Sequence, residues 1–482
     1  MKEFLKNIQH YKHIHIVIIG LALFISLILH FPIFNYDFIG YHVWRQTQTQ
    51  TVIENFCHQD FTILNPRLNN LVYPDGIIRM EFPLYQWIIA CFCKLFGHHI
   101  VVTRIVTFII GAFSLLGFYL LANSILKNKI LAAIGAWAIG FSPIFYYYTI
   151  NPLPDNLALC FGIYALYFFS AYHSELKIKQ LIFFSFFISL ATLCKLPFIL
   201  FAIPFAVYWI KSKAKVKELT IIMIFLLPSI IWYASVIGSW EGNGIVKGIF
   251  ANTITLIKYL DYLQGNLISI IPELYINYAA LFLFIAGVFY LFKNKIINKS
   301  GIANCFFFGL VGVAAYFLYE LNMITTIHDY YLFPFLPFLF LISLYGFKIL
   351  TEQKKKYLRL LAFACILLMP ITAYLRSQTR WNLIDPGFDP ALLNYKKQIQ
   401  ALIPENAICL TGNDDSQMVN LYYLNRKGYT FYEDQLNKDI LNKYKEKGVT
   451  YLISDAKLNE ETINILPAPL AVYNDLKIYK LK

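Results

Sequence analysis

The sequence predicts a polytopic α-helical membrane protein with about eleven transmembrane helices and a small C-terminal α/β domain. The first reason is composition: of 482 residues, 58% are hydrophobic and only 14% are charged, whereas soluble proteins carry roughly 25% charged residues. The second reason is a series of long apolar runs, and the third is a change to polar sequence after residue 375. We therefore divide the chain into a transmembrane domain, residues 1–375, and a soluble domain, residues 376–482. This composition excludes an ordinary soluble protein and a disordered chain.

Each apolar run is judged against the roughly 20 residues that a spanning helix needs. The first run follows a basic N-terminus and has no small-residue cleavage site after it, so we interpret it as a retained helix rather than a signal peptide. The run 83–97 is short and has charged flanks, which favours a helix in the membrane interface. The predicted spans are residues 14–34, 102–123, 130–148, 156–173, 180–194, 196–210, 218–237, 274–292, 302–320, 331–350 and 357–375.

The formal charge of +13 is distributed like a topology signal. Residues 376–482 hold 14 basic and 13 acidic residues, so nearly all of the excess lies in short loops between apolar runs. If the N-terminus is cytoplasmic, the cytoplasmic segments hold 19 Lys and Arg residues, and the loops on the opposite side before residue 376 hold 7, as the positive-inside rule requires. The first loop, residues 35–101, and the tail then lie outside the cytoplasm, and we expect no nucleic-acid partner.

The tail reads as a soluble α/β domain. Short apolar runs at 407–412, 430–432 and 449–455 alternate with helical patterns at 391–403 and 435–448, and Gly, Asn and Asp separate them.

Eight cysteines are present, mostly inside apolar runs, where Cys behaves as a small hydrophobic residue. No CxxC motif or Cys/His ligand spacing occurs along the chain, so the sequence supports neither a zinc module nor a disulfide framework. His98 and His99 are assigned an interfacial position without a function.

Candidate site residues gather at the predicted extracytoplasmic ends of the spans. Ionisable groups at membrane depth are costly, so they tend to face a cavity, to pair or to function. Some can accept a proton or bind a metal, and others can hold a phosphate. The first kind comprises Asp37, Glu81, Asp155 and Asp329, and the second comprises Arg45, Lys195, His328 and Tyr331.

Structural alternatives exist for each of these residues. Arg45 and Glu81 could form a buried charge pair that stabilises the first loop, and Asp155 could cap a helix. Lys195 could reach the membrane interface. The aromatic rings of the last motif could form a membrane belt or core, and these rings belong to Tyr330, Tyr331 and Phe333.

Four motifs occur in order along the chain: HVWRQTQT (42–49), EFPLYQW (81–87), PLPDNLAL (152–159) and HDYYLFPFLP (328–337). Together they resemble the GT-C glycosyltransferases, in the branch that contains protein O-mannosyltransferases and lipid A aminoarabinose transferases, and specifically its bacterial group with a WRQ motif. The resemblance covers essentially the whole chain.

The resemblance implies a multi-pass enzyme of the bacterial inner membrane. Its donor would be a sugar linked to a polyprenyl phosphate in the membrane lipid, and its acceptor a hydroxyl of a glycan, lipid or protein, with inversion. By position, Glu81 matches a donor- or metal-contacting glutamate, Asp155 the second carboxylate, and Lys195 and Tyr331 phosphate-contacting residues. No cofactor is required, and Glu81 is the one ligand that the resemblance offers to a divalent metal.

One position departs from the family pattern. Many bacterial members carry aspartate where this chain has Gln48, and an amide cannot act as a base. The base is then Asp37 or Glu81. We rank Asp37 first because it follows the first span with no local helix to cap, and we rank Glu81 first as the donor or metal contact.

Two other functions fit part of this pattern. A lipid-linked sugar flippase or transporter would also combine many spans with polar groups, although transporters place such groups near the bilayer midplane. An inactive relative acting as a partner subunit would be consistent with Gln48.

The charge asymmetry gives a topology prediction. We expect residues 35–101 and 376–482 on the same, extracytoplasmic side because basic loops stay in the cytoplasm. A reporter that works only outside the cytoplasm, fused after Lys482, should be active. Activity of a cytoplasm-only reporter at the same position would contradict this topology.

Overall fold

The structure is a computed structural model that describes residues 13–212, 216–239, 255–299, 301–326, 328–432 and 435–481. The chain forms two compact units. The first comprises Met1–Phe34, Met80–Phe82 and Arg104–Ser377, and the second Asn35–Arg79, Pro83–Thr103 and Gln378–Lys482. Most of the first loop therefore shares a unit with the tail. The predicted cytoplasmic segments include residues 1–12 and 213–215, which lie outside the described residues.

The first unit is a bundle of apolar helices, which satisfy their own backbone hydrogen bonds as lipid requires. Its longer helices are α2 (Ile14–His30), α5 (Ile100–Leu126), α6 (Lys129–Gly140), α8 (Pro154–Glu175), α9 (Ile178–Cys194), α10 (Ile203–Ser212), α11 (Val216–Val236), α14 (Tyr278–Lys293), α16 (Gly301–Tyr319), α18 (Leu336–Glu352) and α19 (Lys356–Gln378). Shorter elements connect them: α7 (Pro143–Tyr148), α13 (Leu256–Gly265), α15 (Ile296–Lys299), α17 (Leu321–Thr326), and the η segments η3 (Leu196–Ala202), η6 (Asn266–Ile276) and η7 (Asp329–Phe335).

The predicted class, a polytopic helical membrane protein, is confirmed. Among the described residues, seven helices are long and apolar enough to cross a bilayer, and the bent pair Leu256–Ile276 with Tyr278–Lys293 would make an eighth. Three further predicted spans correspond to shorter apolar helices, Lys129–Gly140, Ile178–Cys194 and Leu196–Ser212. The count of eleven therefore stays a prediction.

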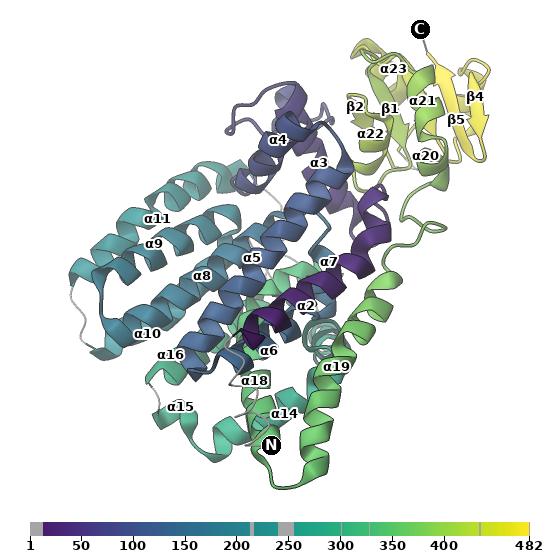
Figure 1. Cartoon of the computed structure of the whole chain (residues 1–482). Helices are drawn as coiled ribbons and strands as arrows, with labels where there is room; N and C mark the ends of the chain where they lie inside the picture. The colour runs from purple at the N-terminus through teal and green to yellow at the C-terminus, as the bar shows by residue number, and fades with distance from the viewer. Residues whose placement is uncertain are drawn as a thin grey trace. The chain divides into compact units, whose positions relative to one another are not determined.

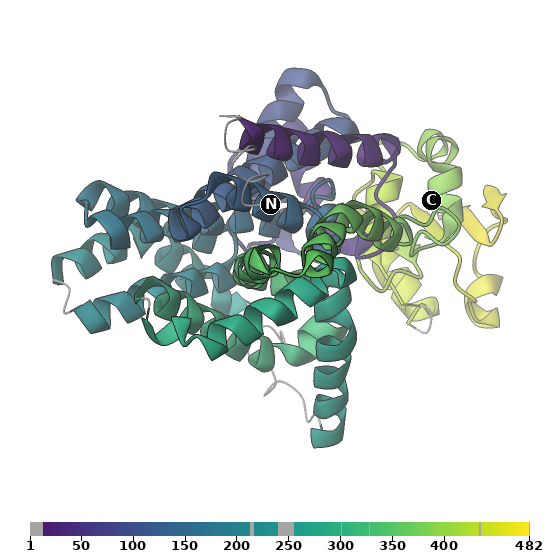
Figure 2. The same ribbon diagram turned by 60° about the horizontal axis from the view of Figure 1, so that its bottom comes forward.

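Helix α9 packs against both α8 and α11, and α14 packs against α18. The turned view in Figure 2 keeps the blue-teal helices α8 to α11 in one group. The contact between α14 and α18 is made by backbone at two glycines. A Cβ atom on Gly346 would lie 1.8 Å from the carbonyl oxygen of Leu283, and one on Gly287 would lie 2.0 Å from that of Ile342. Small residues allow such close approach of membrane helices.

The second unit combines α3 (Val43–His58) and α4 (Leu84–Phe96) with the tail. The tail holds the helices α20 (Pro390–Asn394), α21 (Lys396–Leu402), α22 (Val419–Leu424), α23 (Lys438–Glu446) and α24 (Glu460–Asn464). Its strands are β1 (Cys409–Gly412), β2 (Gly428–Thr430), β3 (Tyr451–Ser454), β4 (Ala471–Tyr473) and β5 (Leu476–Lys480). They form one sheet in the order β2-β1-β3-β5-β4 (Figure 1), parallel at β1 and antiparallel around β5.

The predicted α/β tail is confirmed, with differences in detail. The apolar runs 407–412 and 449–455 contain β1 and β3, whereas β2 begins two residues before the predicted run 430–432 and ends at its first residue. The β4–β5 hairpin was missed because its polar and apolar residues mix over short strands. The first loop is part of the same core: Phe38 packs with tail residues, and the Tyr423 hydroxyl donates to the Phe38 carbonyl at 2.6 Å.

The glycine contact predicts a stability effect. Gly346→Ala should lower the thermal unfolding temperature of the purified protein, because the new methyl group must push α18 away from α14, and overpacking typically costs about 1–3 kcal/mol. The matched control is Gly20→Ala in α2, where an added Cβ meets nothing within 4 Å. Equal unfolding temperatures for the two variants would contradict the backbone contact.

Candidate functional site

Lys195 lies at the centre of a buried cluster in the first unit. It follows α9 directly, and its backbone amide bonds to the Ala191 carbonyl at 3.0 Å. Its side chain is 12% exposed, and its Nζ atom lies 3.6 Å from Asp155 Oδ2 and 3.9 Å from Glu81 Oε2. A buried ammonium needs such partners, since an unpaired charge in the interior is very costly. The side chain of Lys195 is therefore directed at these two carboxylates.

Asp155 is delivered by the first turn of α8. The N-cap of that helix is Leu153, so the capping alternative for Asp155 is wrong. The carboxylate still lies near the positive end of the helix dipole, which favours its charged form. It is 1% exposed.

A polar network fixes the loop before α8. Arg104, which is fully buried, donates to the Ile150 carbonyl at 3.1 Å and to Asn151 Oδ1 at 2.7 Å. Asn156 donates to the carbonyls of Tyr148 and Asn151 at 2.9 and 3.0 Å. The polar run TINPLPDN therefore has a structural purpose as well: its side chains hold the backbone that aims Asp155.

Glu81 stands on a short extended segment rather than on a helix, since α4 begins only at Leu84. The segment is fastened at both sides of the glutamate. The Phe82 amide donates to the Leu193 carbonyl at 3.2 Å, and the Trp232 indole donates to the Met80 carbonyl at 3.0 Å. These contacts bring Glu81 to Lys195, with which it forms an ion pair.

The motif around His328 forms the aromatic wall of the cluster. The rings of His328 and Tyr331 stack with centroids 4.4 Å apart, and His328 Nδ1 lies 2.7 Å from the Tyr330 hydroxyl. Lys195 Nζ lies 5.0 Å from the centre of the Tyr331 ring, within range of a cation–π contact. Asp329 accepts a hydrogen bond from the Tyr148 hydroxyl at 2.9 Å. The aromatic residues are buried, as the core alternative expected, and they also contact the lysine.

Glu320 is a carboxylate that the sequence analysis did not single out, because it stands at the end of a predicted span. It follows α16 and is 3% exposed. Its backbone amide donates to the Tyr316 carbonyl at 2.9 Å. Hydropathy alone gives no signal for such a residue.

Asp37 and Arg45 belong to the second unit. Asp37 accepts hydrogen bonds from the Phe38 amide at 2.9 Å and the Tyr422 hydroxyl at 2.8 Å, and it forms an ion pair with Lys396. The expectation that Asp37 is the freer carboxylate is therefore wrong. Arg45, on α3, is 4% exposed and donates to the side chain of Gln48.

The part of the chain that carries this cluster matches a known protein family. Residues 81–237, which include Glu81, Asp155 and Lys195, match the family model of the dolichyl-phosphate-mannose-protein mannosyltransferases. No curated protein matches the sequence of the chain.

Solved structures match over nearly the whole chain. ArnT from Cupriavidus metallidurans in the apo state has 12% identity and a TM-score of 0.65, covering 99% of this chain and 98% of ArnT. The same protein bound to undecaprenyl phosphate has a TM-score of 0.63 at 12% identity, covering 98% of each chain. The Archaeoglobus fulgidus oligosaccharyltransferase, in complex with Zn and sulfate, has 14% identity and a TM-score of 0.61, covering 91% of this chain and 68% of that one. The predicted resemblance to the GT-C glycosyltransferases is thus confirmed at the level of the fold, and membership of the bacterial group with a WRQ motif stays a prediction.

Proposed function

We propose that the protein transfers a sugar from a polyprenyl-phosphate donor to an acceptor hydroxyl on the extracytoplasmic face of the membrane, with inversion. The observation that carries this proposal is the position of Lys195 between Glu81 and Asp155, against the ring of Tyr331. Such a site offers a base to an attacking hydroxyl and a cation to a departing phosphate. The solved structure of ArnT with undecaprenyl phosphate supports the choice of donor class.

In the proposed reaction, the acceptor oxygen attacks the anomeric carbon as the bond from that carbon to the phosphate oxygen breaks. A carboxylate takes the proton of the acceptor hydroxyl, and polyprenyl phosphate leaves with the bonding electrons. Lys195 contacts the departing phosphate and balances its growing negative charge. Tyr331 and His328 line the phosphate side.

We propose Glu81 as the base. Asp37 is occupied by Lys396 and Tyr422, and Asp155 is the more enclosed partner of Lys195, with a side chain 2% exposed against 8% for Glu81. An acceptor must reach the base from the aqueous side, which favours the more accessible carboxylate. Asp155 then keeps Lys195 in place, and Asp329, held by Tyr148, positions the aromatic wall.

The proposed reaction requires no metal. The ammonium of Lys195 lies within 4 Å of both carboxylates and supplies positive charge beside them. Glu81 remains our candidate ligand for a divalent ion that enters with the donor. The residues present do not form a separate ligand set in this cluster.

The first experiment separates the enzyme from its alternatives. The purified protein is incubated with a panel of polyprenyl-phosphate sugars, and release of polyprenyl phosphate is measured. An enzyme releases it, whereas a flippase moves the intact donor across reconstituted vesicles and an inactive subunit does neither.

Lys195 should control donor affinity. Lys195→Met should weaken binding of polyprenyl phosphate by about 10- to 100-fold, because a hydrogen bond to a charged group is worth about 1.5–3 kcal/mol. Calorimetric titration of the folded protein measures the effect, with Lys195→Arg as the charge-preserving variant. Lys258→Met, at an exposed lysine, is the matched control. Unchanged affinity in Lys195→Met would remove Lys195 from the phosphate site.

Substitutions of Glu81 and of Asp37 should have different effects on turnover and on stability. Glu81→Gln should lower turnover by about 100-fold or more with donor affinity retained, since general bases typically contribute 10²–10⁴-fold. Asp37→Asn should lower the unfolding temperature, because it breaks the pair with Lys396, and the folded fraction should keep turnover within about threefold. An inactive but stable Asp37→Asn together with an active Glu81→Gln would make Asp37 the base.

A further inference from the structure

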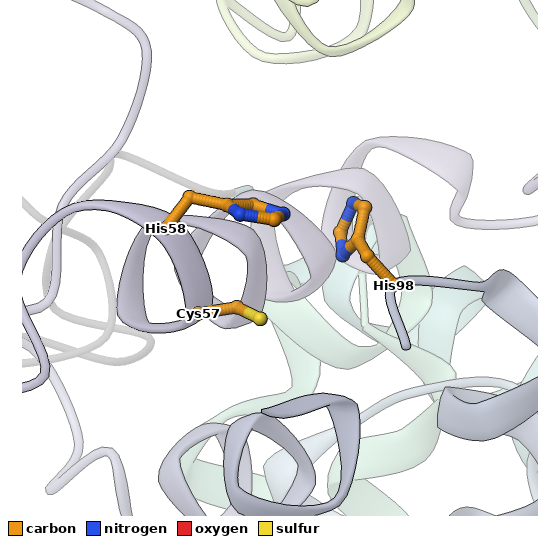
Figure 3. Close-up of side chains that lie close together, drawn as sticks. All are labelled: Cys57, His58 and His98. Carbon is orange, nitrogen blue, oxygen red and sulfur yellow. The ribbon is translucent and has the colours of Figure 1, made fainter. Parts of the chain in front are cut away.

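The last turn of α3 and the connection between α4 and α5 bring three ligand-type side chains together in the second unit. Cys57 and His58 end α3, and His98 follows α4 after Gly97 (Figure 3). One ligand atom from each residue lies within 4.8 Å of the other two. No local motif marks this group, because His98 is far from Cys57 and His58 along the chain.

The local backbone explains why the three side chains meet. Gly97 has a φ of 90°, a left-handed conformation that favours glycine, and it turns the chain so that His98 faces α3. Thr103, at the start of α5, donates to Gln50 Oε1 on α3 at 2.9 Å. The two segments are thus fastened to each other on one side of the cluster.

The ring geometry also indicates a shared centre. The imidazoles of His58 and His98 meet edge to face with centroids 4.5 Å apart, and the Cys57 sulfur points toward the space below them (Figure 3). Glu54, one turn earlier on α3, places Oε1 at 3.6 Å from His98 Nε2. A carboxylate beside a metal-binding imidazole commonly orients the ring.

We propose that Cys57, His58 and His98 bind a divalent transition-metal ion of the zinc class. A thiolate with two imidazoles suits Zn²⁺ and Co²⁺, whereas Mg²⁺ and Ca²⁺ prefer oxygen ligands. Bonds of about 2.0–2.3 Å place the ligand atoms of a tetrahedral ion less than about 4 Å apart, so small side-chain rotations close the set. Both histidines are exposed, which leaves the ion a path of entry and a fourth position for water.

A metal here would tie the end of α3 to the α4–α5 connection. Helix α3 also carries Arg45 and Gln48 of the first sequence motif. The ion would therefore position a helix rather than take part in sugar transfer. This inference does not depend on the proposed function, because no residue of the Lys195 cluster belongs to it.

Cobalt provides a direct probe. Protein treated with a chelator and then dialysed is titrated with Co²⁺ alone, and the sulfur-to-cobalt charge-transfer band in the near ultraviolet is recorded. We expect a saturable band that Zn²⁺ abolishes by displacement. Cys57→Ser should remove the band, and His98→Ala should weaken Co²⁺ binding by at least about 10-fold, the range seen when a metal site loses supporting groups.

Two variants serve as matched controls. Cys91→Ser removes another partly exposed cysteine, and His99→Ala removes the histidine next to His98; both should keep the band and the affinity. The unfolding temperature of each metal-free variant tests its folding. A band that survives in Cys57→Ser, or the absence of a band in the unmodified protein, would overturn the proposal.

Discussion

The buried ammonium of Lys195 is the constraint on which the first unit's polar architecture depends. One lysine faces two buried carboxylates, and each group tolerates burial because the others are present. Removing one partner of such a buried pair typically costs about 3–5 kcal/mol. Several hydrogen bonds hold these partners in place. Trp232 and Leu193 bond to the backbone of the segment that carries Glu81, and Arg104 bonds to the loop that leads to Asp155.

The same arrangement explains how a site can exist in a bundle that is otherwise apolar. Three short breaks in the helical pattern meet at Lys195: the segment 80–82, the loop 149–153 and the turn between α9 and η3. Irregular backbone is tolerated at membrane depth only where protein or water covers it. Here the polar groups of the irregular backbone form hydrogen bonds with neighbouring segments of the chain, so the three breaks cost little stability. The same breaks carry the charged side chains on which the proposed reaction depends.

Much of the fold could be predicted from the sequence, because long apolar runs have few alternatives to helices. The contribution of Asp155 and Lys195 to a buried cluster could also be predicted, since isolated charges beside apolar runs must find partners. The ion pair and hydrogen bond of Asp37 could not be predicted, because its partners Lys396 and Tyr422 come from the far end of the chain. The burial of Glu320 and the grouping of Cys57 with the two histidines could not be predicted for a similar reason, because burial and long-range proximity leave no local pattern in the sequence.

The discontinuity of the second unit has a consequence for biosynthesis. Its core joins Phe38 to residues of the tail, and the backbone of Asn69 accepts a hydrogen bond from Gly428 at 2.9 Å. During translation, nearly all the membrane helices are made between these two halves. Domains generally fold as units once their residues are available. The shared core can therefore form only after the tail has been synthesised, and a truncation that removes the tail would leave Phe38 without its packing partners.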